Sequence, residues 1–93
     1  MTHPMQTERE TRTREIIADF ARLNIRPGFE GESIPLGTAQ TRPELADLVE
    51  GQRVVLVEPG NLRADGVIAI RVAADVRYYY GVIVGPVMDD PAA

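Results

Sequence analysis

The second half of the chain has an apolar pattern that is typical of β-strands. Three runs rich in β-branched residues, 53–58, 66–72 and 77–84, are separated by segments of turn residues. The connection between the last two runs is short enough for a hairpin in which Val72 lies opposite Arg77. We therefore predict an antiparallel sheet in this half.

Both faces of the predicted hairpin are largely apolar. In this register one face carries Tyr79 with Ile68 and Ile70. The other face carries Val67, Ala69, Arg71, Tyr78, Tyr80 and Val82. Such a hairpin is buried on two sides in a barrel or sandwich, or it meets a partner with its second face.

The first half of the chain begins with helical signals. Thr7 and Glu10 have the spacing of a capping box, in which each side chain satisfies a backbone donor at a helix start. Four apolar residues then follow the helical period: Ile16, Ile17, Phe20 and Leu23. These signals predict a helix over 7–25, which Arg26-Pro27-Gly28 ends.

A second helical signal lies in the middle of the chain. Thr41 and Glu44 repeat the capping-box spacing, and the apolar face that follows predicts a short helix over 42–50. A weak strand is expected near 33–38, before this helix.

These elements predict one α+β domain. We expect the N-terminal helix and the short second helix to pack on a small antiparallel sheet curled toward an SH3-like barrel. The β-rich core spans 33–84, and the ends, 1–6 and 88–93, are expected to be loose. A chain of 93 residues buries a modest core, so dimerisation would be a natural supplement.

Charge narrows the choice of partner. The formal charge is −4, all the basic residues are arginine, and neither half of the chain is basic. Proteins that bind nucleic acid by neutralising phosphates usually show a basic excess, so binding through the whole surface is disfavoured, although a local arginine patch stays open. The sequence has no signal-peptide pattern and no apolar run near the length of a membrane span. We expect a cytoplasmic protein without membrane contact.

Several catalytic chemistries lack the residues they need. The chain has no cysteine and no lysine, and its one histidine, His3, lies at the N-terminus. Thiolate, Schiff-base and serine–histidine mechanisms are therefore disfavoured. Two carboxylate pairs, Glu30 with Glu32 and Asp89 with Asp90, fit exposed loop charges better than an acid–base pair. We expect no enzyme, no cofactor and no bound metal.

The run Tyr78-Tyr79-Tyr80, with Arg71 and Arg77 nearby, is the most informative group of residues. Tyrosine and arginine combine stacking faces, polar ends and charge, which suits a recognition surface. Tyrosine is also a strong strand former, so one or two of the rings are expected in the core.

One stretch of the chain carries the pieces of a known pattern. They are the strand Gly51-Gln52-Arg53-Val54-x-Leu56, the turn Glu58-Pro59-x-Asn61, Asp65, the strand Ala69-Ile70-Arg71-Val72, and Gly81-Val82. In this order they resemble the HIRAN domain, a small β-barrel found on helicases and nucleases that binds single-stranded DNA ends. The chain departs from the family at Leu62-Arg63-Ala64, where the family usually has a proline and an aromatic residue. The resemblance implies nucleic-acid contacts by the turn around Asn61 and Arg63.

The preferred hypothesis is a non-catalytic interaction module that binds another protein or itself as a homodimer. Its expected contact residues are Tyr78, Tyr80, Arg71, Arg77, Asn61 and Arg63. The alternative is a HIRAN-like domain that binds single-stranded nucleic acid, and the acidity of the chain favours the first hypothesis. A small enzyme that uses an acidic pair is the least favoured class.

Overall fold

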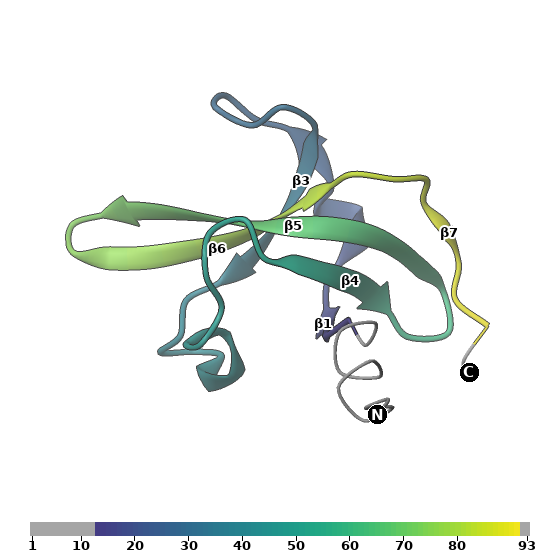
Figure 1. Cartoon of the computed structure of the whole chain (residues 1–93), viewed down its shortest axis with the longest axis horizontal. Helices are drawn as coiled ribbons and strands as arrows, with labels where there is room; N and C mark the ends of the chain where they lie inside the picture. Colours follow the sequence, from purple (N-terminus) through teal and green to yellow (C-terminus); the bar gives the residue numbers. More distant parts are fainter. Residues whose placement is uncertain (1–12, 92–93) are drawn as a thin grey trace, which may run out of the picture.

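The computed structural model describes residues 13–91 and shows a domain built mostly from one bent sheet (Figure 1). The strands are β1 (Glu15–Ile17), β2 (Asn24–Ile25), β3 (Glu32–Gly37), β4 (Arg53–Glu58), β5 (Leu62–Ala73), β6 (Val76–Ile83) and β7 (Met88–Asp89). Two short 3-10 turns, η1 (Phe20–Arg22) and η2 (Pro43–Leu45), lie between strands. Within residues 13–91 no helix is long and apolar enough to span a bilayer.

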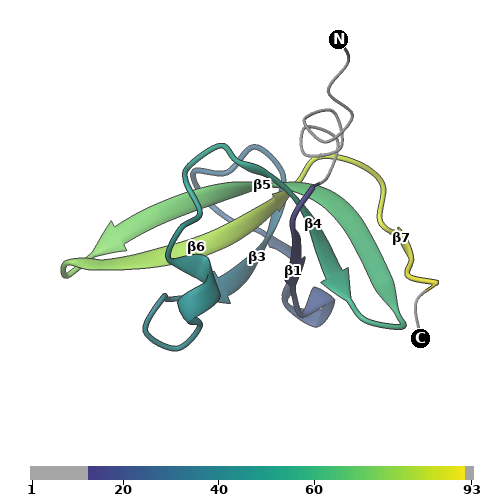
Figure 2. The ribbon, with the colours of Figure 1, turned by 60° about the horizontal axis from the view of Figure 1, so that its bottom comes forward.

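The sheet follows the strand order β1-β4-β5-β6-β3-β2, with β7 paired to the start of β5. Only the β1–β4 pair is parallel among the strands of the described chain. The long β5 pairs with β4 through residues 62–67 and with β6 through residues 66–73, and it bends between the two (Figure 2). The bend turns side chains from five strands toward one core.

The β5–β6 hairpin confirms the predicted register. Val72 pairs with Arg77, and Ile70 pairs with Tyr79, which is buried. Ala74 and Asp75 form the tight turn with φ angles of 51° and 65°, a left-handed pair whose twist matches that of the strands. The hairpin extends past the rest of the molecule (Figure 1).

The predicted helix over 7–25 is wrong for its described part. Residues 15–17 form β1, which pairs with β4 so that Ile16 lies opposite Leu56. The period of two also fits this segment, because Ile16, Ala18 and Phe20 are buried while Ile17 is exposed. The predicted helix start at Thr7 and Glu10 lies outside the described residues.

The second predicted helix, 42–50, is also wrong. Only the 3-10 turn η2 forms, and Leu45 and Leu48 still reach the core because they are three residues apart. The end of the segment bonds to the sheet instead: the Gly51 N–H donates to the Ile68 carbonyl at 2.8 Å. Because neither helix forms within residues 13–91, the α+β prediction is replaced by a mostly-sheet domain.

Residues 88–90, part of the tail predicted to be loose over 88–93, are attached to the sheet and its turn. Met88 and Asp89 pair with the start of β5 as β7. The Asp90 carboxylate is buried, and it accepts hydrogen bonds from the Gly60 N–H at 2.8 Å and from Arg63 at 3.3 Å. A buried carboxylate needs hydrogen-bond donors, and Gly60 and Arg63 supply them. These bonds therefore attach the C-terminal segment to the turn before β5 and to the start of β5.

The centre of the core is a large side chain over two glycines. Leu56 on β4 is fully buried and lies directly above Gly66 on β5 and Gly81 on β6. A Cβ atom built on Gly66 would lie 2.8 Å from a Leu56 methyl carbon, and one on Gly81 would lie 2.6 Å from it. Both distances are shorter than a carbon–carbon contact, so neither position has room for a side chain while Leu56 is in place.

Gly81→Ala should therefore lower the free energy of unfolding by roughly 1–3 kcal/mol, the usual cost of overpacking a core. Urea denaturation measures the change. Gly85→Ala is the matched control, because its added Cβ would meet its nearest neighbour, Asp65, at an ordinary 3.8 Å.

The double variant Gly81→Ala with Leu56→Val tests the cause. If the Leu56 methyls are the obstacle, the double variant will lose less free energy of unfolding than the sum of the losses of the two single variants. Additive costs would contradict this account.

Candidate functional site

The structure separates the predicted contact residues into three groups. Tyr78, Tyr80 and Arg71 share the outer face of the β5–β6 hairpin, whereas Tyr79 faces the core. Arg77 lies on the other face of the hairpin, where it pairs with Val72. Asn61 and Arg63 lie at the far end of β5, where the C-terminal segment docks. The residues predicted to form one contact surface therefore lie in three separate places on the molecule.

Asn61 and Arg63 already have partners within the chain. The Asn61 side-chain amide donates to the Glu58 carboxylate, and the Asn61 carbonyl accepts from the Asp90 N–H at 3.0 Å. Arg63 forms ion pairs with Asp90 at 3.3 Å and with Glu15 at 3.5 Å. This turn holds the ends of the domain together.

The outer face of the hairpin is partly covered by the loop between β2 and β3. Pro27 and Gly28 make the loop turn sharply: Gly28 has φ of +86°, and the Phe29 N–H donates to the Arg26 carbonyl at 3.3 Å. This matches a type II turn, which favours proline followed by glycine. The turn directs Phe29 back over the sheet.

Phe29 packs between two of the predicted contact residues. Its ring centroid lies 5.0 Å from that of Tyr80, and the Arg71 guanidinium carbon lies 4.3 Å from the Phe29 centroid. Arg71 also donates to the Gly28 carbonyl at 2.9 Å. The second apolar face therefore meets part of its own chain, held by a cation–π contact.

An open groove remains beside Phe29, and we call it the tyrosine groove. It encloses about 380 Å³ and is lined by Arg22, Arg26, Pro35, Gly37, Tyr78, Tyr79 and Tyr80. Tyr78 is 40% exposed. The far wall comes from β3, whose register shifts between Pro35 and Gly37 where it meets β6.

Arg26 is fixed at the wall of the tyrosine groove by neutral acceptors. Its guanidinium donates to the Arg22 carbonyl at 2.9 Å, to the Asn24 carbonyl at 3.3 Å and to the Ser33 hydroxyl at 3.1 Å. It also donates to the Ser33 carbonyl. These bonds hold the charge in place without neutralising it.

A second hollow of about 390 Å³ continues past Arg22 and Pro35. It contains Asp19 and Glu58, but both carboxylates accept backbone hydrogen bonds: Asp19 from Ala21 at 3.0 Å and Glu58 from Phe20 at 3.3 Å. Its other wall holds Arg42. This hollow therefore carries charges of both signs.

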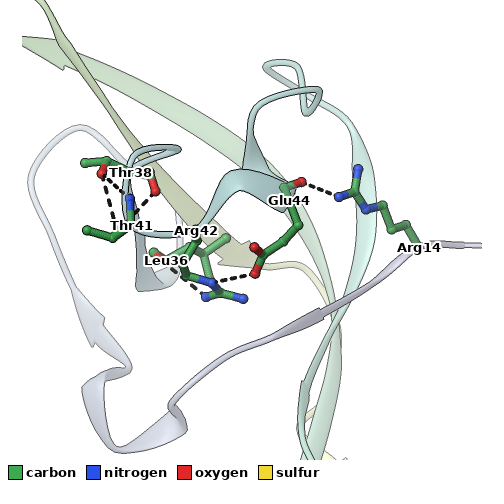
Figure 3. Close-up of polar contacts among 6 residues, drawn as sticks. All are labelled: Arg14, Leu36, Thr38, Thr41, Arg42 and Glu44. Atoms are coloured by element: carbon green, nitrogen blue, oxygen red, sulfur yellow. Dashed lines mark hydrogen bonds and ion pairs between the residues drawn. The ribbon is translucent and has the colours of Figure 1, made fainter.

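Arg42 and Arg14 anchor the irregular segment that borders this hollow (Figure 3). Arg42 donates to the Leu36 carbonyl at 3.2 Å and to the Glu44 carboxylate at 2.9 Å. Arg14 donates to the Glu44 carbonyl and forms an ion pair with Asp47 at 2.7 Å. The segment between β3 and β4 is thus attached to β3 and to the residues before β1.

These contacts lower two carboxyl pKa values. The pKa of Asp47 lies below its usual 3.8, chiefly because Arg14 donates to the carboxylate. The pKa of Glu44 lies below its usual 4.5, first because of a hydrogen bond from its own backbone N–H and then because of Arg42.

The carboxylate pairs do not form a site in the described part of the chain. Glu32 is exposed on β3 and Glu30 lies in the covering loop, whereas Asp89 is exposed and its neighbour Asp90 is buried. Among residues 13–91 no group of three carboxylates or histidines is placed to hold a metal ion.

Sequence reasoning missed Arg22 and Arg26, which line the tyrosine groove. It assigned Arg22 to a helix and Arg26 to the turn that ends the helix, so neither was linked to the tyrosines. The link depends on β3 pairing with β6, a contact between residues more than forty positions apart. The sequence gives no local signal for it.

Comparisons of the chain with protein-family models, curated proteins and solved structures find no significant match. They neither support nor contradict the resemblance to the HIRAN domain.

Arg14→Gln should raise the pKa of Asp47 toward 3.8, because the variant lacks the charged donor. A lowered folded-state pKa contributes stability that is present above pH 3.8 and is lost as pH falls through the folded-state value, so the variant should lose less stability on acidification. NMR titration of the carboxyl carbons measures the pKa. Arg53→Gln, which changes an exposed arginine elsewhere, is the control. An unchanged Asp47 pKa in Arg14→Gln would contradict the assignment.

Proposed function

We propose that this domain is a non-catalytic interaction module that binds a segment of a protein partner in the tyrosine groove. The observation that carries the proposal is the exposure of Tyr78 in a preformed groove beside Arg22 and Arg26. Tyrosine and arginine dominate the binding energy of many protein interfaces, because they combine large contact area with polar ends.

Rigidity of the groove supports the same proposal. Tyr80 is packed by Phe29, Arg26 is held by four hydrogen bonds, and Pro35 lies opposite Tyr80 in the β3–β6 pair. Groups that are already ordered lose little entropy on binding, so more of their contact energy appears as affinity.

The finer features of the protein are part of this proposal. We infer that the bent sheet corresponds to a small SH3-like barrel and that the protein acts in the cytoplasm. A second copy of the chain is the simplest candidate partner, because a domain of this size gains core by association.

Selection of a random peptide library displayed on phage against the immobilised domain tests the proposal without knowledge of the partner. Peptides that bind the wild-type domain should lose at least about tenfold in affinity against Tyr78→Ser, the loss expected for a residue at the centre of an interface. Val72→Ser is the matched control, since Val72 is an exposed apolar residue on the other face of the same hairpin.

Two outcomes would count against the proposal. One is a failure to enrich any peptide, and the other is enrichment of peptides that bind Tyr78→Ser and the wild type equally. If the partner is a second copy, the wild-type domain will sediment as a dimer and the Tyr78→Ser, Tyr80→Ser double variant as a monomer.

Single-stranded nucleic acid is the second candidate ligand. Two tyrosines next to two arginines can stack bases and contact phosphates, which agrees with the HIRAN resemblance although the surface lies away from the Asn61 turn. Under this alternative a labelled oligothymidylate will bind at low salt, and its affinity will fall steeply as salt rises.

Fluorescence anisotropy at low and moderate salt measures this binding. A domain that leaves the oligothymidylate free at low salt does not use its groove for nucleic acid. Arg77→Gln is the control, because Arg77 lies on the other face of the hairpin.

A further inference from the structure

We propose that the tyrosine groove recognises carboxylates, with Arg22 and Arg26 as the cationic pair, and therefore that its ligand is an acidic peptide segment. This inference rests on the proposed function and names the chemistry of the partner. Its basis is the position of these two arginines, neither of them in an ion pair, in a groove whose lining holds no acidic residue.

Three arginines of residues 13–91 have their charge paired within the chain. Arg14, Arg42 and Arg63 each form an ion pair with a carboxylate. Within the same residues neither Arg22 nor Arg26 has a carboxylate within 4.0 Å. Arg53, Arg71 and Arg77 also lack a carboxylate within this distance, but only Arg22 and Arg26 line the tyrosine groove.

Arg26 is prepared to bind an anion. Its bonds to Ser33 are partly buried, so the guanidinium has given up some of its water, and all of its bonded acceptors are uncharged. A fixed charge in a partly desolvated wall interacts more strongly with an opposite charge than it would in open water. These bonds use Nη1 and Nη2, which leaves the Nε–H as a further donor.

Arg22 is coupled to this site through the backbone. Its carbonyl accepts a hydrogen bond from Arg26, and its exposed side chain lines both the tyrosine groove and the adjoining hollow. The two arginines therefore line one groove that has no acidic residue in its lining. The protein as a whole is acidic, with a formal charge of −4.

The surroundings of the groove favour a short acidic segment over a nucleic acid strand. The hollow on one side contains Asp19 and Glu58, and the outer face beyond Phe29 contains Glu30 and Glu50. Besides the groove arginines, these two surfaces hold four carboxylates and two arginines, Arg42 and Arg71, so a chain of phosphates that continued past the groove would meet an excess of like charge. A peptide with one or two carboxylates can place them on the arginines and its apolar groups on Tyr78.

Binding of labelled hexaglutamate at low salt, followed by fluorescence anisotropy, tests the proposal, with hexaglutamine as the uncharged probe. Hexaglutamate should bind the wild-type domain and Arg77→Gln, and it should bind Arg22→Gln at least about tenfold more weakly, as expected for the loss of a charged interface residue. Arg22→Gln is the decisive variant because the Arg22 side chain has no hydrogen bond or ion pair within residues 13–91, so its loss leaves the fold intact. Arg26→Gln should show the same loss, with circular dichroism checking its fold.

Three results would overturn the proposal. Hexaglutamate could bind no more tightly than hexaglutamine, Arg22→Gln could bind it as the wild type does, or oligothymidylate could bind more tightly with the same dependence on Arg22. Failure of the proposed function gives a different result. Library peptides that need Tyr78 but not Arg22 would leave the proposed function in place and refute only the carboxylate assignment.

Discussion

The packing of Leu56 against Gly66 and Gly81 is the constraint on which the rest of the fold depends. Three strands meet under this one side chain, and the two glycines allow β5 and β6 to approach it closely. Ala64, directly opposite Leu56 on β5, is also small. A large residue on one strand over small residues on the next two lets the sheet bend around its core without a cavity.

The bend explains why a groove exists on the outer face. Because Leu56 and Tyr79 fill the inside, the alternation of β6 sends Tyr78 and Tyr80 outward. The loop after β2 crosses this outer face but covers only part of it, where its Phe29 packs against Tyr80 and Arg71. The uncovered part is the tyrosine groove, so its position follows from the core, the strand alternation and the length of one loop.

Elements formed by neighbouring residues could be predicted, and elements formed by distant ones could not. The β5–β6 hairpin and its register follow from alternation and a short connection, which are local. The segment around Ile16 fits both helical and strand periods, and the choice was made by pairing with Leu56, forty residues later in the chain. For the same reason Tyr78 was predicted as a contact residue from the sequence, while Arg22 and Arg26, which line the same groove, were not. The bond between Asn61 and Asp90 was not predicted either, because Asp90 lies in a segment expected to be loose.

The use of arginine in place of lysine has a physical reason in this fold. A mostly-sheet domain with many irregular segments leaves backbone carbonyls without strand partners, and guanidinium groups satisfy several of them: Arg14 bonds to Glu44, Arg26 to three carbonyls, Arg42 to Leu36 and Arg71 to Gly28. A planar group with five donors can bind several acceptors at once, which an ammonium on a flexible stem does less well. Carbonyls satisfy the donors but do not remove the charge. An arginine recruited to hold a loop, such as Arg26, therefore stays cationic, and where a groove opens beside it the structural bond also creates a place for an anion.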